Sequence, residues 1–175
     1  LETGTFALHL EESPLSETLA QAVGAVWAKG EAKGISLAIH CDDTITVCHD
    51  PKWTAEALGN ILDNAVKYTP AGGQVTITVR PWQFYTRIDI TDTGIGIPEA
   101  DRPNIFNRFY RVDKARSREH GGSGLGLSIV HDAAALYGGT VAVDGVEPHG
   151  TRFTVTFPRA AADDAPETQK EVPET

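Results

Sequence analysis

The chain has 175 residues, of which 41% are hydrophobic and 22% charged, a composition typical of one globular domain with a buried core. Its formal net charge of −9 argues against a nucleic-acid partner and against direct contact with an anionic membrane surface. No stretch approaches the roughly 18–20 consecutive apolar residues that cross a bilayer, and no secretory signal pattern is present. Because the sequence contains no methionine, we expect it to be a piece of a longer chain.

The first half of the chain alternates helix signals with pairs of short strands. Weak alternation predicts a strand over residues 5–10, and Ser13 with Pro14 predicts the start of a helix that runs to about Lys33, with Gly34 as its stop. Residues 35–41 and 44–50 read as two short strands. A helix is then predicted over residues 52–69, ended by Pro70.

The second half repeats this organisation with longer strands. Two hairpins are predicted from strict alternation, over residues 74–80 with 85–91 and over residues 140–145 with 150–157. Between them we expect a short helical piece at residues 104–109 and a glycine-opened helix that ends near Tyr137. Strands in pairs predict an α/β two-layer sandwich, in which a mixed, largely antiparallel sheet carries the helices on one face.

We expect one domain over residues 1–158 and a disordered acidic tail over residues 159–175. The tail consists mainly of Ala, Asp, Glu, Pro and Thr, which bury too little apolar surface to offset the entropy of ordering it.

Two cysteines lie in the near-palindrome His40-Cys41 and Cys48-His49. Two Cys and two His are a ligand set for tetrahedral zinc, but the spacing lacks the CxxC knuckle. The alternative, which we favour, is that both cysteines are small buried hydrophobes on neighbouring strands.

The helix predicted at residues 52–69 carries two stripes. The apolar stripe consists of Leu58, Ile61, Leu62, Ala65 and Val66. The second stripe is polar and consists of Asn60, Asn64, Lys67 and Tyr68. Asparagine is a mediocre helix former, so this polar seam either bonds backbone in the core or faces a ligand.

Two glycine-rich segments and a basic stretch add to this pattern. In "DTGIGIP", Asp92 ends a strand, where its carboxylate either caps a turn or accepts a hydrogen bond from an exocyclic amine such as that of adenine. The segment "GGSGLGLS" either opens a helix at an anion site or is a flexible loop. A basic stretch precedes it and contains Arg108, Arg111, Lys114, Arg116 and Arg118.

Taken together these features favour a nucleotide triphosphate with its metal. Amide oxygens are hard neutral ligands suited to Mg²⁺ whose charge phosphate oxygens already balance. Lysine and arginine donate to phosphates, and Tyr68 offers an aromatic face to a base. The sequence therefore predicts that the polar seam faces a nucleotide triphosphate and its metal.

At this point a family resemblance emerges from four motifs. "NILDNAVKYTP" resembles the N box of bacterial sensor histidine kinases, "DTGIGIP" their first glycine box, "FNRFYRVD" their F box and "GGSGLGLSIV" their second glycine box. The motifs follow the order and spacing of the family over residues 8–158. The resemblance implies the Bergerat ATP-binding fold, which is shared with DNA gyrase B, MutL and a heat-shock chaperone.

The resemblance also implies site residues. It assigns Mg²⁺ and phosphate to Asn64 and Asn60, phosphate contact to Lys67, and a supporting role to Glu56. It adds the nucleotide-contacting positions Tyr68, Asp92, Gly94, Gly96, Ile97, Arg111, Gly122, Ser123, Gly124, Leu125, Gly126 and Thr151. Among these, Asp92 would read the adenine amine, Arg111 would reach the phosphates, and the glycines from Gly122 onward would hinge the ATP lid.

One further likeness is deceptive. His9, Pro14 and Leu15 copy the skeleton of the family's phosphoacceptor box, but Leu10 stands where the family has an acidic residue, and Asn60 follows too soon for a helical hairpin between them. We therefore interpret His9 as a strand histidine and expect the dimerisation domain with the true acceptor to lie outside this chain.

The predicted function is that of the catalytic domain of a two-component sensor histidine kinase, which uses Mg²⁺-ATP to phosphorylate a histidine on that separate domain. The implied partners are this acceptor domain and a response-regulator receiver domain downstream. The implied location is cytoplasmic, with an inner-membrane sensor as one form of the parent. Two alternatives are a Bergerat-type ATPase and a degenerate, non-catalytic nucleotide-sensing module.

Overall fold

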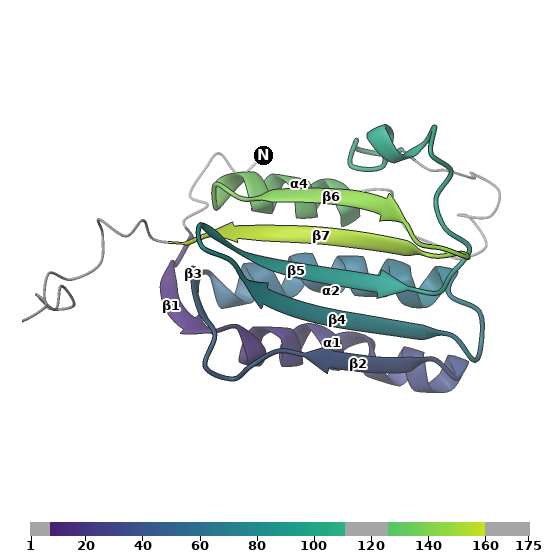
Figure 1. The fold of residues 1–175 in the computed structure, drawn as a ribbon, viewed down its shortest axis with the longest axis horizontal. Helices are drawn as coiled ribbons and strands as arrows, with labels where there is room; N and C mark the ends of the chain where they lie inside the picture. The colour runs from purple at the N-terminus through teal and green to yellow at the C-terminus, as the bar shows by residue number, and fades with distance from the viewer. Residues whose placement is uncertain (1–7, 111–125, 160–175) are drawn as a thin grey trace, which may run out of the picture.

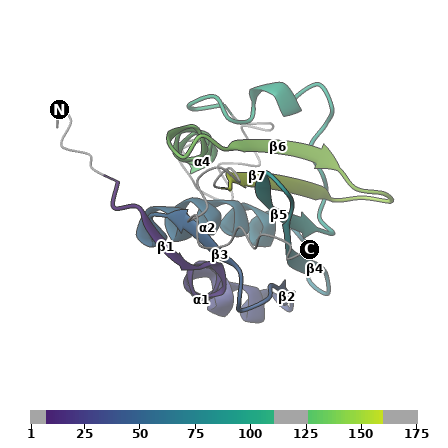
Figure 2. The ribbon, with the colours of Figure 1, turned by 60° about the vertical axis from the view of Figure 1, so that its left-hand side comes forward.

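The structure, a computed structural model, describes residues 8–110 and 126–159. They form two layers, with a twisted sheet on one side and helices packed on the other (Figures 1 and 2). The described helices are α1 (Leu15–Lys33), α2 (Pro51–Tyr68), α4 (Gly126–Leu136) and a one-turn 3₁₀ helix η1 (Arg102–Asn104). This arrangement confirms the predicted α/β sandwich with its helices on one face.

The main sheet has five strands in the order β2-β4-β5-β7-β6. Its strands are β2 (Ser36–His40), β4 (Gln74–Pro81), β5 (Tyr85–Asp92), β6 (Thr140–Gly145) and β7 (Thr151–Pro158). β2 pairs with β4 in parallel and the other neighbours are antiparallel, so the sheet is mixed and largely antiparallel, as predicted. β7 lies between β5 and β6, which brings the last strand of the domain beside the strand that ends in Asp92.

Local sequence explains the central helix. Asp50 caps α2 by accepting a hydrogen bond from the backbone amide of Trp53 at 3.2 Å, and Pro51 occupies the first turn, where its missing N–H costs nothing. The predicted apolar stripe faces the sheet, and each of its residues is at most 4% exposed: Leu58, Ile61, Leu62, Ala65 and Val66. α2 therefore packs in the middle of the helical layer, between α1 and α4.

The predicted position of the N-terminal strand was wrong. Residues 8–10, which belong to the strand predicted over 5–10, form no strand, and the first strand of the described chain is β1 (Glu11–Pro14). β1 pairs with β3 (Thr46–His49) in a separate two-stranded sheet. His9 precedes β1, so it is not a strand histidine, and its backbone amide donates to Asp50 Oδ2 at 2.9 Å.

Another correction concerns the helical piece predicted at residues 104–109. The only helix in this part of the described chain is the 3₁₀ turn η1, which starts earlier, and turns and bends follow it. Pro103 accounts for the shift, because its fixed φ angle and missing N–H suit the start of a short helical turn.

The two cysteines are not buried neighbours. Cys48 is exposed on β3, whereas Cys41 follows the end of β2 and is half-buried against the core; β2 and β3 belong to different sheets. His49 is fully buried, with Nε2 2.7 Å from Thr18 Oγ1 and Nδ1 2.6 Å from the Val47 carbonyl oxygen. Because a carbonyl only accepts, Nδ1 carries the hydrogen, and Nε2 accepts from the threonine hydroxyl. Within residues 8–110 and 126–159 no group of three or more His, Cys, Asp or Glu could hold a metal ion.

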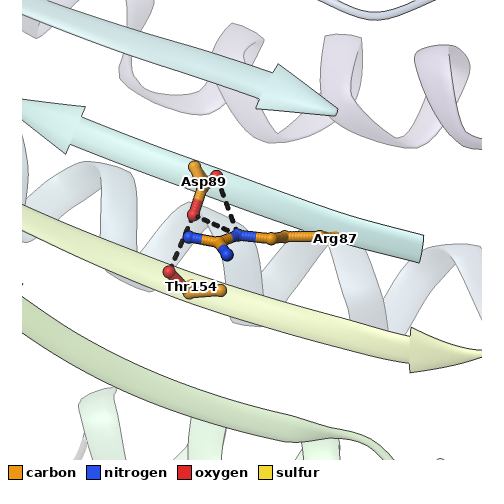
Figure 3. Close-up of polar contacts among 3 residues, drawn as sticks. All are labelled: Arg87, Asp89 and Thr154. Atoms are coloured by element: carbon orange, nitrogen blue, oxygen red, sulfur yellow. Dashed lines mark hydrogen bonds and ion pairs between the residues drawn. The ribbon is translucent and has the colours of Figure 1, made fainter. Parts of the chain in front are cut away.

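The face of the sheet away from the helices is polar and tied together across strands. Arg87 Nε donates to both carboxylate oxygens of Asp89 at 3.0 Å, and the Thr154 hydroxyl donates to Asp89 Oδ1 at 2.7 Å (Figure 3). Asp89 is only 8% exposed, so these bonds compensate a buried carboxylate. They link β5 to β7 on the side that the helices leave open.

α1 and α2 are joined by polar contacts at the C-terminal end of α2. Lys33 Nζ donates to the carbonyl oxygens of Val66 at 2.8 Å and of Lys67 at 2.7 Å, which are among the carbonyls that a helix end leaves unpaired. Nearby, Asp63 bridges Lys29 of α1 and Lys67 of α2, each at 3.1 Å.

Among the described helices none is long and apolar enough to cross a membrane.

Replacing Lys33 tests this junction. Lys33→Met keeps the apolar stem and removes two charge-assisted bonds at the negative end of a helix, so we expect a loss of about 1–2 kcal/mol in the free energy of unfolding. Lys29→Met is the matched control, because Lys29 is 66% exposed and a surface ion pair contributes less than about 1 kcal/mol. Urea titration of both variants measures the difference, and equal losses would contradict the assignment.

Candidate functional site

Several elements end at the same edge of the sheet. β5 ends at Asp92, β7 begins at Thr151, and α2 ends at Tyr68 on the same side of the molecule (Figure 1). The antiparallel register pairs Asp92 directly with Thr151. Asp92 and Thr151, predicted as site residues from motifs far apart in the sequence, are therefore neighbours.

Asp92 is a buried carboxylate with an asymmetric environment. It is 6% exposed, and its Oδ1 accepts from the backbone amides of Gly94 at 2.9 Å and Thr151 at 3.2 Å. Burial raises the pKa of the Asp92 carboxyl, and the two amide bonds partly offset this rise. Since both amides engage Oδ1, Oδ2 is left as the oxygen for an outside donor.

Glycines surround this carboxylate because side chains would not fit. A Cβ on Gly94 would lie 2.6 Å from the Tyr68 carbonyl oxygen and 2.9 Å from Asp92 Oδ1. At Gly150, where φ is +133°, a Cβ would lie 2.1 Å from the Asp92 carbonyl oxygen. A Cβ on Gly96 would approach the Gly150 carbonyl oxygen to 3.3 Å. The turns after β5 and before β7 are thus packed backbone against backbone around Asp92.

The polar seam of α2 lies along the rim of this region. Asn60 and Asn64 are half-buried, and among the described residues neither side chain makes a hydrogen bond. The backbone-bonding alternative for these asparagines therefore receives no support. The first residue of α4 approaches the seam, because a Cβ on Gly126 would lie 3.7 Å from Asn60 Cγ. Glu56 is exposed one turn before Asn60.

The remaining seam residues lie at the end of α2. Lys67 Nζ is held by Asp63 Oδ2 at 3.1 Å, on the side of α2 that faces α1. Tyr68 is half-buried, and its carbonyl oxygen accepts from the Ile95 amide at 3.2 Å. Ile97 packs against the core, and its carbonyl oxygen accepts from Arg102 Nε at 3.1 Å.

Part of the predicted site cannot be located. The predicted residues Arg111, Gly122, Ser123, Gly124 and Leu125 lie outside the described residues. The structure thus brings together Asp92, Gly94, Gly96, Thr151 and the end of α2, and it sets Asn60 against the start of α4.

Two residues at this edge were missed by the sequence reasoning. Thr69 is fully buried, and within the described chain its hydroxyl has no hydrogen-bond partner; Oγ1 lies 3.1 Å from where a Cβ on Gly94 would stand. His149 Nδ1 lies 3.0 Å from the Gly94 carbonyl oxygen. The position of Thr69 directly after the seam was an available signal, whereas no local pattern points to His149.

An apolar hollow lies elsewhere and is a poor nucleotide site. It lies between the N-terminal segment, α2 and α4, and is lined by Leu8, Trp53, Ile129, Asp132, Ala133 and Leu136. Its one charged group is an aspartate, which repels phosphate, and it includes none of the predicted site residues.

Comparison with known proteins identifies the class. Residues 49–161 match the family of histidine kinase-, DNA gyrase B- and HSP90-like ATPases. Sensor histidine kinase WalK of Bacillus subtilis is 47% identical over 105 residues, which are 59% of this chain and 17% of that protein. The chain spans less than two fifths of the length of WalK and of the other sensor kinases compared with it.

Solved structures agree with this match. The mycobacterial sensor histidine kinase MprB superposes with a TM-score of 0.74 at 30% identity, over 85% of this chain and 97% of that one. Full-length ShkA in complex with AMPPNP gives a TM-score of 0.76 at 31% identity, over 91% of this chain and 33% of that one.

The chain therefore belongs to the histidine kinase-, gyrase B- and HSP90-like ATPase family. Within that family it is the ATP-binding catalytic domain of a sensor histidine kinase, as the motifs predicted.

Replacing the buried carboxylate separates its cost to folding from its use in binding. In Asp92→Asn, Oδ1 can still accept both amide bonds, but an amide nitrogen replaces Oδ2, the acceptor that we predict for the adenine amine. We expect ATP affinity to fall about 10- to 150-fold, the equivalent of about 1.5–3 kcal/mol. Calorimetric titration measures this change, and wild-type affinity would remove Asp92 as the base reader.

The raised pKa of Asp92 predicts how the stability of Asp92→Asn, relative to wild type, depends on pH. A carboxyl whose pKa is raised by folding supports stability below its ordinary pKa and loses that support as the pH rises through the raised value. At neutral pH the melting temperature of Asp92→Asn should therefore be no lower than that of wild type. Any excess in the melting temperature of the variant should disappear in acid. A lower melting temperature of the variant at pH 7 would contradict this sign.

Proposed function

We propose that this chain works in a sensor histidine kinase by binding Mg²⁺-ATP and donating the γ-phosphoryl group to a histidine on a separate dimerisation domain. A response-regulator receiver domain would then accept the phosphoryl group from that histidine. The observation that carries the proposal is the buried Asp92 carboxylate, which keeps Oδ2 available beside two glycine turns and the polar seam of α2.

In this proposal Asp92 reads the base. Its Oδ2 accepts from the exocyclic amine of adenine, and Gly94, Gly96 and Ile97 form the wall on that side. The Thr151 hydroxyl stands next to Asp92 and the base, and Tyr68 lies against the nucleotide. A buried, fixed acceptor favours adenine over a base with a carbonyl at that position, because two acceptors would then face each other without a hydrogen.

The seam of α2 would hold the phosphates and Mg²⁺. Asn60 and Asn64 fit the ion, because their amide oxygens are hard donors that the described residues leave unengaged. With no acidic cluster among the described residues, the metal would depend on phosphate oxygens for charge balance. Bound there, Mg²⁺ would neutralise charge that develops on the transferred group.

The cationic groups complete the proposed phosphate site. Lys67 would have to share or exchange its ion pair with Asp63 when phosphate binds. Arg111 and the lid residues Gly122, Ser123, Gly124, Leu125 and Gly126 would add further donors. Glu56, exposed on the seam, would support this arrangement without activating water, since a kinase must suppress hydrolysis.

The chemistry assigned to this chain is positioning and charge stabilisation. The nucleophile and its general base would lie on the partner domain. His9 is unsuited to the role of phosphoacceptor, because it does not lie on a helical hairpin. It precedes a short strand, and its backbone amide donates to Asp50.

We further propose a catalytic domain over residues 1–158, an acidic tail over 159–175, and a cytoplasmic location. ATP and receiver domains are both available there, and the parent could be an inner-membrane sensor. An ATPase of the gyrase or chaperone kind and a non-catalytic nucleotide sensor are the competing functions, and the two experiments below separate them.

The first experiment titrates ATP into the chain by calorimetry with and without Mg²⁺. We expect binding that Mg²⁺ strengthens and that Asn64→Ala weakens by at least about tenfold, since the variant loses a ligand to a charged group. Ala135→Ser, an exposed change on α4, is the control. Equal affinity with and without the metal would contradict the role of Asn64.

The second experiment follows the γ-phosphoryl group. We expect the chain alone to neither phosphorylate itself nor turn ATP over steadily, and to form acid-labile phosphohistidine when the parent's dimerisation domain is added. Steady hydrolysis by the chain alone would favour the ATPase. ATP binding without transfer in the presence of the acceptor domain would favour the nucleotide sensor.

A further inference from the structure

The turn between β6 and β7 packs directly on the turn that follows β5. Residues 146–150 form this turn, closed by a bond from the Val146 amide to the Gly150 carbonyl oxygen at 3.2 Å. The backbones of Gly150 and Asp92 approach so closely that a Cβ would not fit between them. The β6–β7 turn is therefore part of the wall around Asp92, although none of the recognised motifs includes its tip.

His149 makes the side-chain contact between the two turns. Its Nδ1 lies 3.0 Å from the carbonyl oxygen of Gly94, which is 55 residues away in the chain. A carbonyl oxygen can only accept, so Nδ1 carries the hydrogen and donates. This donor is present in the Nδ1–H neutral form of imidazole and in its protonated form alike.

The peptide that His149 contacts is held at its other end as well. The carbonyl of Gly94 and the amide of Ile95 belong to one planar peptide group. The Ile95 amide donates to the Tyr68 carbonyl oxygen at 3.2 Å, at the end of α2. His149 and Tyr68 therefore hold opposite edges of one peptide plane.

This peptide adjoins the residue that orients Asp92. The Gly94 amide donates to Asp92 Oδ1 at 2.9 Å, and a glycine rotates more freely about its backbone bonds than any other residue. Without restraint on the following peptide, Gly94 has the freedom to turn its own amide away from the carboxylate. Together with the Thr151 amide, which also donates to Oδ1, a fixed Gly94–Ile95 peptide restrains the direction in which Asp92 Oδ2 points.

We infer that His149 is a positioning residue of the nucleotide site, which holds the Gly94 carbonyl and through it the base-reading geometry of Asp92. The inference rests on the proposed role of Asp92 in ATP binding. His149 itself is exposed at the rim of the sheet edge, so one hydrogen bond there contributes little to global stability while it restrains the wall of the site.

The test compares three substitutions by calorimetry with ATP and with ADP. Asn at position 149 places an amide nitrogen where Nδ1 stands, one bond from Cγ, whereas Gln places it one bond farther out. We expect His149→Ala and His149→Gln to weaken both nucleotides by the same factor, about two- to tenfold, the value of one net hydrogen bond. His149→Asn should restore most of the affinity.

Controls make each outcome decisive. His40→Ala removes an exposed histidine from the edge strand β2 and should change neither affinity nor melting temperature. The melting temperature of all His149 variants should stay within about 2 °C of wild type, since a surface change alters stability by less than about 0.5 kcal/mol.

Three results would overturn the inference: unchanged affinity in His149→Ala, equal losses in the Asn and Gln variants, or losses that track melting temperature. If the wild-type chain fails to bind ATP in the presence of Mg²⁺, the proposed function itself is wrong. If the wild-type chain binds ATP normally and the His149 variants bind it equally well, only the inference about His149 is wrong.

Discussion

Burial of one carboxylate, that of Asp92, is the constraint on which this end of the molecule depends. An ionised carboxyl away from water is costly unless donors surround it, and here two backbone amides supply them to a single oxygen. One amide comes from the turn after β5 and the other from the start of β7. The sheet order, with β7 between β5 and β6, therefore matters for the site. With any other neighbour of β5, Asp92 would lack its second donor, the Thr151 amide.

The helical layer meets this edge through α2, which has two faces with different functions. The apolar face fixes the helix on the sheet with residues that are almost fully buried. The polar seam leaves two asparagine side chains at the rim, where no described residue satisfies them. Lys33 caps the last carbonyls of the helix from α1, so the end of α2 that supports Ile95 through Tyr68 is held from two directions.

These features suit a domain that binds a nucleotide firmly and leaves the chemical step to a second domain. The described residues provide a candidate base reader, Asp92, and candidate ligands for phosphate and metal. The histidine that accepts the phosphoryl group belongs, in our proposal, to another part of the parent protein. Division of the reaction in this way makes phosphotransfer dependent on how the two domains are brought together, which is where a sensor can exert control.

The sequence by itself determined most of the helices and strands, and it named the candidate site residues. Periodicity is a local property, so the stripe of α2, the helix ended by Gly34 and both hairpins could be read directly and are confirmed. Asp92 and the asparagines of α2 could be named because their side-chain types together suit a nucleotide and its metal, and because their motifs resemble those of sensor histidine kinases. The contacts of Asp92, Asn60 and Asn64 with Mg²⁺-ATP stay predictions.

The tertiary structure decided what depends on residues far apart in the chain. The first strand of the described chain lies at Glu11–Pro14 because its pairing with β3 sets its position, whereas the weak alternation predicted a strand over residues 5–10. The pairing of Lys29 with Asp63, the buried hydroxyl of Thr69 and the bond from His149 to Gly94 likewise follow from packing between elements. No local pattern encodes such contacts, because which side chains meet at an edge is fixed only when the sheet order and the helix positions are fixed.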